Sequence, residues 1–258
     1  MKKKNGTYRM CVDLRKVNTN LRKLAFNMPL LDEILEALKG AKIFSLMDIK
    51  DAYLTIPIEE SSKHLLAFEI LTKGKYEYEV LPFGLANWAP VFLKTINTIM
   101  GDILFDGCVA FSDDILIFSK TVEEHCRTLK KVLERLRKYD LRVAANKMVL
   151  AADQVTYLGL VLTSEGANPC PAKTAAIDAM EQPNNLRQLQ GVMGSFNFYK
   201  RFIQNYSKIC APLYNLLRKD VEFIWDSACQ EAYDHLKKAL TSDPILIVGD
   251  VHEIRPHE

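Results

Sequence analysis

Apolar residues in the middle of the chain form two short runs separated by three polar residues. The runs are Val109–Phe111 and Ile115–Phe118, and Ser112, Asp113 and Asp114 lie between them. Short runs rich in β-branched and aromatic residues favour buried strands, so this segment predicts a β-hairpin with the polar residues at or near its turn. Two adjacent carboxylates here either form an ordinary Asp-rich turn or bind a divalent cation that offsets their repulsion. These residues alone leave both interpretations open.

Similar patterns predict further elements along the chain. Strands are expected at 8–14, 43–48, 53–58, 66–70, 76–80 and 155–162, with Pro57 in an irregular or edge position and Gly159 at a bend. Helices are expected at 31–38, 91–104, 122–139, 171–180, 185–203, 209–218 and 227–240. The segment 168–171 is the best linker candidate, because the chain changes there from mixed to helical character.

The helix expected at 122–139 has the clearest pattern. Thr121 and Glu124 form a capping box at its start. Its apolar residues predict a buried stripe made of Val122, Cys126, Leu129, Val132, Leu133 and Leu136.

Composition and charge narrow the class of protein. The 258 residues are 48% hydrophobic and 26% charged, as in a globular protein, and no apolar run is long enough to cross a membrane. The six cysteines lack CxxC spacing, and no secretory signal is visible, so we expect an intracellular location (cytoplasm, virus-like particle or nucleus). Residues 1–25 carry a net charge of about +7, which suits either a bound polyanion or a solvated face.

Three carboxylates can meet in this arrangement. Asp48 ends the strand at 43–48, and that strand can lie beside the hairpin that carries Asp113 and Asp114. A cluster of oxygen ligands prefers hard cations such as Mg²⁺. Two such ions can stabilise the attacking and leaving oxygens of a phosphoryl transfer.

Five segments occur in the order of reverse transcriptase motifs: 3–18, 44–53, 81–87, 111–119 and 157–159. With 198–203, 211–213 and 223–225 they make the chain resemble, over about 2–246, the polymerase of gypsy-type LTR retrotransposons and, more distantly, retroviral enzymes. The resemblance implies an α+β right-hand polymerase fold. Fingers and palm with an antiparallel sheet would span 1–167, a helical thumb and connection 168–241, and a truncated start of a missing ribonuclease H domain 242–258.

The resemblance also implies a function and partners. The function would be RNA-directed and DNA-directed DNA polymerisation, with two Mg²⁺ ions (Mn²⁺ as a substitute) transferring nucleotides from dNTP to a primer 3′-hydroxyl. The partners would be an RNA or DNA template with its primer, dNTP, and the missing ribonuclease H and integrase parts of a polyprotein, without a membrane.

Site residues follow from the same motifs. The resemblance implies that Asp48, Asp113 and Asp114 are the catalytic, metal-binding carboxylates and that the carbonyl of Ile49 helps to hold a metal. It assigns nucleotide binding to a second set, which consists of Lys3, Arg9, Ile49, Tyr53, Phe83, Gly84 and Lys147. It assigns positioning of the primer end to Tyr157, Leu158 and Gly159.

Some residues depart from the family pattern. Phe111-Ser112 replaces a Tyr followed by a larger apolar residue, and Trp88 displaces Pro90 by one position. The chain also looks shorter than the family at both ends. Two alternatives therefore stay open: a non-catalytic nucleic-acid-binding or interaction remnant of a retroelement polymerase, and a template-independent nucleotidyltransferase.

Overall fold

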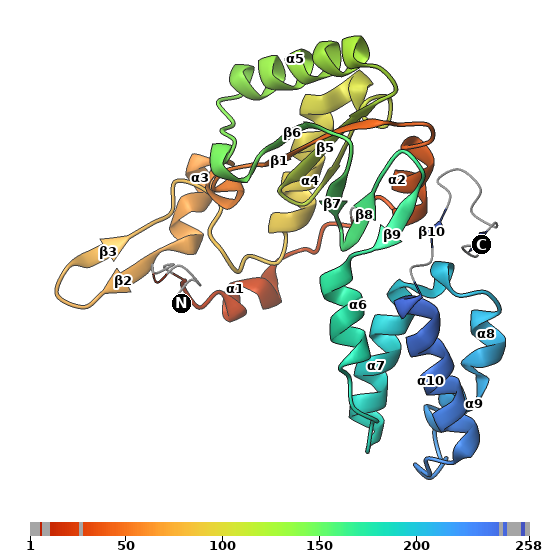
Figure 1. Cartoon of the computed structure of the whole chain (residues 1–258). Helices are drawn as coiled ribbons and strands as arrows, with labels where there is room; N and C mark the ends of the chain where they lie inside the picture. Colours follow the sequence, from red (N-terminus) through yellow and green to blue (C-terminus); the bar gives the residue numbers. More distant parts are fainter. Residues whose placement is uncertain (1–5, 7–10, 26–27, 243–244, 247–253, 256–258) are drawn as a thin grey trace. The chain divides into compact units, whose positions relative to one another are not determined.

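The computed structural model describes residues 6, 11–25, 28–242, 245–246 and 254–255, except for the side chains of residues 53, 245–246 and 254–255. The fold is α+β (Figure 1). The α-helices are α1 Arg15–Asn20, α2 Leu31–Ala37, α3 Glu60–Lys63, α4 Trp88–Met100, α5 Val122–Lys138, α6 Pro171–Asp178, α7 Leu186–Phe198, α8 Tyr206–Ile209, α9 Ala211–Leu216 and α10 Ser227–Thr241. The 3₁₀ helices are η1 Ala52–Leu54, η2 His64–Leu66, η3 Gly101–Ile103, η4 Ala145–Lys147 and η5 Lys200–Phe202. The strands are β1 Ile43–Asp48, β2 Phe68–Ile70, β3 Gly74–Tyr76, β4 Cys108–Phe111, β5 Asp114–Ser119, β6 Val149–Ala152, β7 Val155–Tyr157, β8 Leu160–Leu162, β9 Ala167–Pro169, β10 Ile245–Leu246 and β11 Ile254–Arg255.

The chain forms two compact units. The first contains residues 1–37 and 44–151, and the second contains 38–43 and 152–258. The sequence placed the change of character at 168, but the strands just before that position belong to the second unit, because β8 pairs with β9 and β9 pairs with β10. Asn168, which we expected in a linker, therefore lies in a strand opposite Val161.

A four-stranded sheet with the order β4-β5-β1-β6 forms the centre of the first unit. The predicted hairpin is confirmed, and its antiparallel strands pair from Cys108↔Ile117 to Phe111↔Asp114. Cys108 and Ile117 belong to the core that the sheet shares with α4 and α5. The intervening residues Val109 and Leu116 are also fully buried. Both faces of the hairpin are thus covered, which explains why its apolar runs are uninterrupted.

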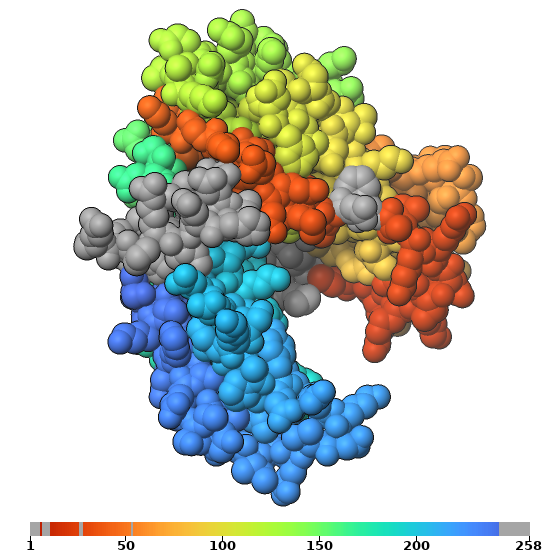
Figure 2. Space-filling view, turned by 90° about the vertical axis from the view of Figure 1, so that its right-hand side faces the viewer, coloured from red at the N-terminus to blue at the C-terminus, as the bar shows by residue number. Residues whose placement is uncertain are grey.

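Helices α4 and α5 lie side by side on this core (Figure 2). Helix α4 begins three residues earlier than predicted, since Pro90 falls in its first turn, where a missing backbone N–H is tolerated. It ends before Gly101, which has a φ of 48°. Trp88 is buried and stacks on Phe92 with ring centroids 5.1 Å apart. The residue that displaces Pro90 in the motif is thus part of the core.

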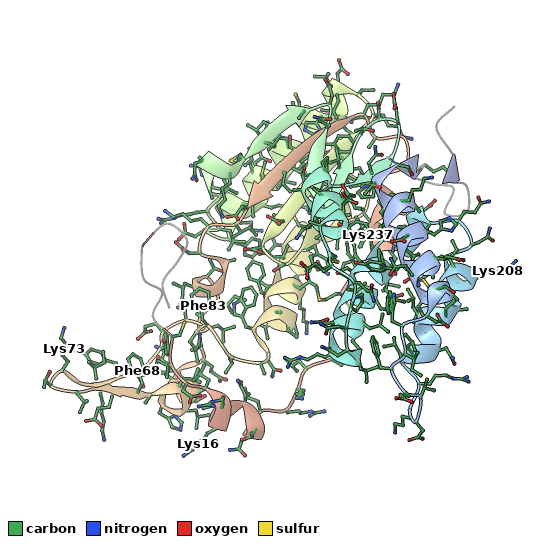
Figure 3. All side chains as sticks on the ribbon, turned by 60° about the horizontal axis from the view of Figure 1, so that its bottom comes forward. Lys16, Phe68, Lys73, Phe83, Lys208 and Lys237 are labelled. Atoms are coloured by element: carbon green, nitrogen blue, oxygen red, sulfur yellow. The ribbon has the colours of Figure 1, made fainter. Side chains whose placement is uncertain are left out.

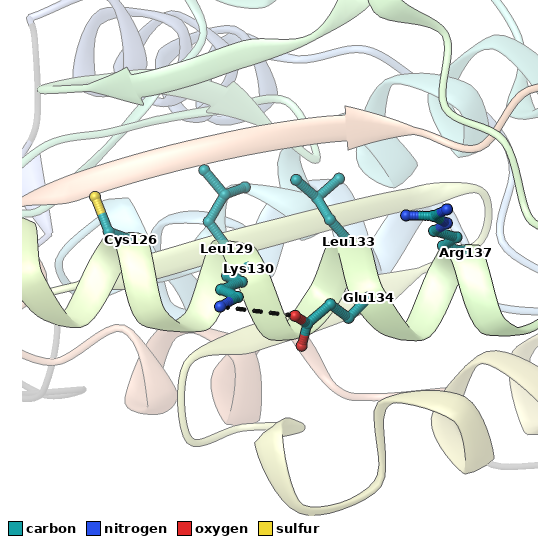
Figure 4. A pocket seen from close by; sticks show the side chains of 6 residues that line it. All are labelled: Cys126, Leu129, Lys130, Leu133, Glu134 and Arg137. Carbon is teal, nitrogen blue, oxygen red and sulfur yellow. Dashed lines mark ion pairs between the residues drawn. The ribbon is translucent and has the colours of Figure 1, made fainter.

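Helix α5 forms the Thr121 half of the predicted capping box, and of the predicted buried stripe it confirms Val132 and Leu136, with Leu129 partly buried. The Glu124 N–H donates to Thr121 Oγ1 at 3.2 Å, and the Glu124 carboxylate accepts from the Lys120 N–H. Val122, Cys126 and Leu133 are exposed. Figure 4 shows Cys126, Leu129 and Leu133 along a shallow surface pocket of the helix.

His125 is buried, whereas Val122 and Cys126, which the apolar pattern predicted to be buried, are exposed. Its Nε2 lies 2.7 Å from Ser45 Oγ of β1, and its Nδ1 lies 2.9 Å from Ser119 Oγ of β5. Ser45 Oγ also accepts from the Ala151 N–H of β6 at 2.9 Å. Ser45, Ser119 and His125 are the polar or charged residues buried in the described part of the chain. This His125 cluster (Ser45, Ser119 and His125) joins α5 to three strands of the sheet.

Two segments that precede α4 differ in how well they were predicted. The second hairpin forms from β2 and β3, with Phe68 opposite Tyr76 and Lys73 at its tip (Figure 3), but its second strand is Gly74–Tyr76 and shares only Tyr76 with the strand expected at 76–80. The extended segment expected at 53–58 is wrong in its first half, where η1 forms. Asp51 has a φ of 51° there, and its carbonyl accepts from the Leu54 N–H, so local bonds replace a sheet ladder.

The second unit combines a sheet with a helical bundle. Its strand order is β11-β10-β9-β8-β7, and helices α6 to α10 follow in the sequence. The four predicted helical regions are confirmed, with the third split at Cys210 into α8 and α9. The Tyr233 hydroxyl of α10 donates to the Met180 carbonyl at 2.9 Å, after α6 ends. No helix within the described ranges is both long and apolar enough to span a membrane.

Candidate active site

The first unit brings Asp48 next to the hairpin that carries Asp113 and Asp114. Strand β1 ends at Asp48 and lies between β5 and β6 in the sheet. The N–H of the following residue, Ile49, donates to the Asp113 carbonyl at 2.8 Å. The end of β1 is therefore fixed beside the turn of the hairpin, an arrangement that the sequence allowed but did not establish.

The turn itself consists of Ser112 and Asp113, because Phe111 and Asp114 pair across it. Ser112 has a φ of 56°, a backbone conformation that favours glycine. The hairpin therefore holds a residue with a side chain in an unfavourable conformation, directly beside the two aspartates.

We expect Ser112→Gly to stabilise the protein by about 1 kcal/mol, because glycine removes the steric cost of the positive φ. For a chain of this length this corresponds to a Tm increase of roughly 2–4 °C. Thermal unfolding followed by circular dichroism would measure it. Ser164→Gly is the matched control, because Ser164 is exposed and does not have a positive φ. An equal change in both variants would contradict the assignment of strain to Ser112.

The three aspartates interact electrostatically. The pKa of Asp114 is raised to about 6, mainly by burial and then by repulsion from Asp113 and Asp48. The positive charge of Lys147 opposes this increase only in part. The cluster therefore carries an excess of negative charge that a bound cation would offset.

Lys147 is positioned by the strand segment that follows α5. Residues 142–144 pair with the end of β1, since the Lys50 N–H donates to the Arg142 carbonyl and the Ala144 N–H donates to the Asp48 carbonyl. Helix η4 then starts beside Asp48, and Lys147 Nζ lies 2.7 Å from Asp48 Oδ2. This hydrogen bond raises the pKa of Lys147, so its ammonium group stays charged at neutral pH.

The donor chemistry of this cluster fits a hard divalent cation, because three carboxylates and the backbone carbonyl of Ile49 are all oxygen ligands. Burial first, and then repulsion from Asp113 and Asp48, raise the pKa of Asp114, and a cation bound there would favour the charged carboxylate. Among the residues described, however, no three His, Cys, Asp or Glu side chains converge closely enough to hold an ion between them. Asp48 instead forms its ion pair with Lys147. The three aspartates thus interact electrostatically, but their side chains do not form a preorganised coordination shell.

Phe83, which Figure 3 labels, and Gly84 lie in the loop before α4. Side-chain amides fix that loop. Asn18 at the end of α1 donates to the Gly84 carbonyl and accepts from the Ala86 N–H, both at 2.8 Å. Asn87 donates in turn to the Arg22 carbonyl at 2.8 Å. Sequence reasoning gave no role to Asn18, although it is the last residue of the motif at 3–18.

The remaining predicted residues divide into two groups. Tyr157, Leu158 and Gly159 belong to the second unit, where Leu158 and Gly159 form the turn between β7 and β8. Lys3 and Arg9 lie outside the described residues, as does the side chain of Tyr53 in η1. Their assigned roles stay predictions.

Comparison with known proteins agrees with the resemblance found in the sequence motifs. The family described as "Reverse transcriptase (RNA-dependent DNA polymerase)" matches residues 1–162. The Tf2-3 and Tf2-7 transposon polyproteins of Schizosaccharomyces pombe are each 34% identical over 244 residues, which is 95% of this chain but 18% of each polyprotein. The chain thus spans about a fifth of the length of these relatives.

Solved structures with the same fold include the foamy viral protease-reverse transcriptase. One complex with double-stranded DNA matches 96% of this chain and 44% of that chain, with 27% identity and a TM-score of 0.85. A complex with an RNA/DNA hybrid matches 93% of this chain and 32% of that chain, with 28% identity and a TM-score of 0.78. The α+β polymerase fold expected from the sequence is thereby confirmed.

Proposed function

The chain belongs to the reverse transcriptase (RNA-dependent DNA polymerase) family, and on this premise we propose that it extends a primer 3′-hydroxyl with deoxynucleotides on an RNA or DNA template. The observation that carries the proposal is the pairing of β1 with the β4–β5 hairpin, which places Asp48 beside Asp113 and Asp114. The raised pKa of Asp114 supports it, since burial and, after it, repulsion from Asp113 and Asp48 disfavour the charged carboxylate, and a bound cation would offset both.

Reverse transcriptases generally depend on divalent metal ions. We assign Asp48, Asp113 and Asp114, with the Ile49 carbonyl, to hold two Mg²⁺ ions, for which Mn²⁺ can substitute. Ions held by these residues would supply activation of the primer hydroxyl and stabilisation of the charge on the leaving pyrophosphate. We assign Lys147 as the proton donor to that pyrophosphate, because it lies at the carboxylate cluster, 2.7 Å from Asp48, and carries a proton at neutral pH.

The nucleotide contacts other residues in this proposal. Phe83 and Gly84 line the nucleotide site on the loop that Asn18 fixes. Gly84 has a φ of 94°, a backbone conformation that would be strained for a residue with a side chain. We assign Lys3 and Arg9 to the triphosphate and Tyr53 to the exclusion of the ribose 2′-hydroxyl. Template pairing would select the nucleotide, so protein contacts to the duplex should be mainly to phosphates.

The source of such a chain would be the pol polyprotein of a gypsy-type LTR retroelement. The order of the motifs and the 34% identity to transposon polyproteins support this affiliation. The nucleic-acid complexes of the foamy viral enzymes support template and primer as partners.

A primer-extension assay tests the proposal. The chain is incubated with a labelled DNA primer on an RNA or a DNA template, with dNTPs and either Mg²⁺ or Mn²⁺. We expect extension on both templates, no extension without a template, and none when either metal is removed with EDTA. Asp113→Asn is the inactive control, and its primer–template affinity should stay at the wild-type level.

Other outcomes would contradict the proposal in distinct ways. Retained primer–template binding without extension under any metal would identify a non-catalytic nucleic-acid-binding remnant. Extension without a template would identify a template-independent nucleotidyltransferase.

A further inference from the structure

The turn between β7 and β8 has a strained backbone. Tyr157 and Leu160 pair across it, so Leu158 and Gly159 are its two central residues. Their φ angles are 51° and 78°, and positive φ at both positions is the pattern of a type I′ hairpin turn. Glycine adopts this conformation freely, but leucine does so only when the surroundings hold it there.

Two hydrogen bonds to one carbonyl hold this turn. The Gly159 oxygen accepts from the Cys170 N–H at 2.9 Å and from the Tyr199 hydroxyl at 3.1 Å. Cys170 is the N-cap of α6, and Tyr199 is the C-cap of α7. The turn is therefore tied to the ends of two helices of the same unit.

The Tyr199 side chain is well placed to act as a fixed donor. It is only 5% exposed, and its ring lies edge-on against Phe198, with centroids 4.8 Å apart. Burial raises the pKa of its phenol, so the hydroxyl keeps its proton. A Cβ atom at Gly159 would lie 3.2 Å from the Tyr199 oxygen, so a larger residue at this position would push against the tyrosine hydroxyl.

Close packing does not fix the turn on all sides. A cavity of about 520 Å³ lies between the turn and helices α6 and α7, and its lining includes Leu158, Gly159, Ile177 and Phe198. Because packing leaves this side of the turn open, the two hydrogen bonds to the Gly159 carbonyl add to the constraint on its position.

We propose that Tyr199 is a positioning residue for the primer: its hydroxyl fixes the Gly159 carbonyl and thereby the turn that orients the primer 3′-end. This inference rests on the proposed function and on the role in positioning the primer end that the resemblance to reverse transcriptases implies for residues 157–159. It adds a residue from the helical part of the chain that the reverse transcriptase motifs do not assign to the reaction.

The test compares two Tyr→Phe variants in single-nucleotide extension of a labelled DNA primer on a DNA template. Tyr199→Phe removes the bond to Gly159. Tyr206→Phe is the matched control, because Tyr206 is also buried in this unit and donates to the Asn197 side chain at 3.0 Å, without contacting the turn. We expect a similar small decrease in Tm in both variants.

The kinetic parameters separate positioning from stability. In Tyr199→Phe, kcat should fall by about tenfold or more, because a misplaced 3′-hydroxyl slows the chemical step. KM for dNTP and Kd for the primer–template, measured by fluorescence anisotropy, should stay within about twofold, because phosphate contacts dominate binding. Tyr206→Phe should keep the wild-type kcat.

The outcomes distinguish this inference from the proposed function. Wild-type protein that does not extend the primer would overturn the proposed function and, with it, the role of Tyr199. An active wild type with equal kcat in both variants would overturn the role of Tyr199 alone. An equal loss of kcat in both variants, in step with Tm, would reduce Tyr199 to a structural residue and overturn the inference as well.

Discussion

Replacing Asp114 with asparagine should abolish primer extension and at the same time stabilise the metal-free protein. Asparagine has the same shape but no negative charge, so it cannot hold a metal as the carboxylate does. A metal contributes several kcal/mol to the transition state of phosphoryl transfer, so we expect a decrease in kcat of roughly 10³-fold or more. The same substitution removes a partly buried charge that Asp48 and Asp113 repel.

The sign of the stability change follows from the pKa of Asp114. Its folded-state value of about 6 is raised above the ordinary 3.8. The folded state therefore favours the protonated carboxyl: its stabilising contribution is full below pH 3.8 and is lost as the pH rises through about 6. At pH 7.5 the wild type carries this cost, which we place at about 1–2 kcal/mol after allowing for solvent screening, and the asparagine variant does not.

Two measurements test both halves of this prediction. In EDTA at pH 7.5, Tm of Asp114→Asn should exceed that of the wild type by roughly 3–6 °C. Added Mg²⁺ should then raise Tm of the wild type but not of the variant, because only the wild type binds the ion in its folded state. Asp106→Asn, at an exposed position of the same unit, should change neither Tm nor kcat. A variant that loses activity and also unfolds more easily would show that Asp114 supports the fold rather than the reaction.

The sequence predicted the elements that carry the candidate site because their signals are local. The uninterrupted apolar runs around Asp113 and Asp114 reflect burial on both faces of one hairpin, and the register follows once the turn is known. Asp48 could be placed at a strand end for the same reason. The pairing of the two elements was only a possibility in the sequence, and the bond between Ile49 and Asp113 makes it a fact of the structure.

The features that the sequence did not predict depend on contacts between distant residues. His125 is buried because Ser45 and Ser119, 80 and 6 residues away, supply its hydrogen bonds. A pattern of apolar residues does not predict a polar side chain that is buried because its hydrogen bonds are satisfied. Asn18 reaches Gly84 across 66 residues. The boundary between the two units lies earlier in the chain than predicted, because Asn168 pairs in a sheet although its Pro-rich surroundings are typical of a linker.

The hydrogen bonds of the His125 cluster define one protonation state. Ser119 Oγ donates to the Thr121 carbonyl at 3.1 Å, so it accepts from Nδ1–H of His125. Nε2 is then an acceptor for the Ser45 hydroxyl, whose oxygen accepts from the Ala151 N–H. The neutral imidazole satisfies every group. A proton on Nε2 would leave the Ser45 hydroxyl without an acceptor, in agreement with the pKa of His125, which burial lowers.

We therefore expect His125→Leu to destabilise the protein by about 2–4 kcal/mol, since it leaves a buried hydroxyl unpaired and disrupts packing between α5 and three strands. Urea unfolding at pH 7.5 would measure the loss. His235→Leu is the matched control, because His235 is exposed on α10, and its effect should stay within about 0.5 kcal/mol.

The pH dependence of unfolding distinguishes loss of the cluster from loss of packing alone. A lowered folded-state pKa means that the unfolded chain binds a proton below pH 6.5 that the folded chain does not, so the stabilisation is full above pH 6.5 and is lost as the pH falls. The wild type should lose stability relative to His125→Leu between pH 6.5 and 5, by at most about 1.4 kcal/mol per pH unit for one proton. Taking the difference between the two proteins removes the opposite contribution of Asp114, which titrates in both. A constant difference across this range would show that His125 carries its proton equally in the folded and unfolded chain, contrary to the neutral cluster.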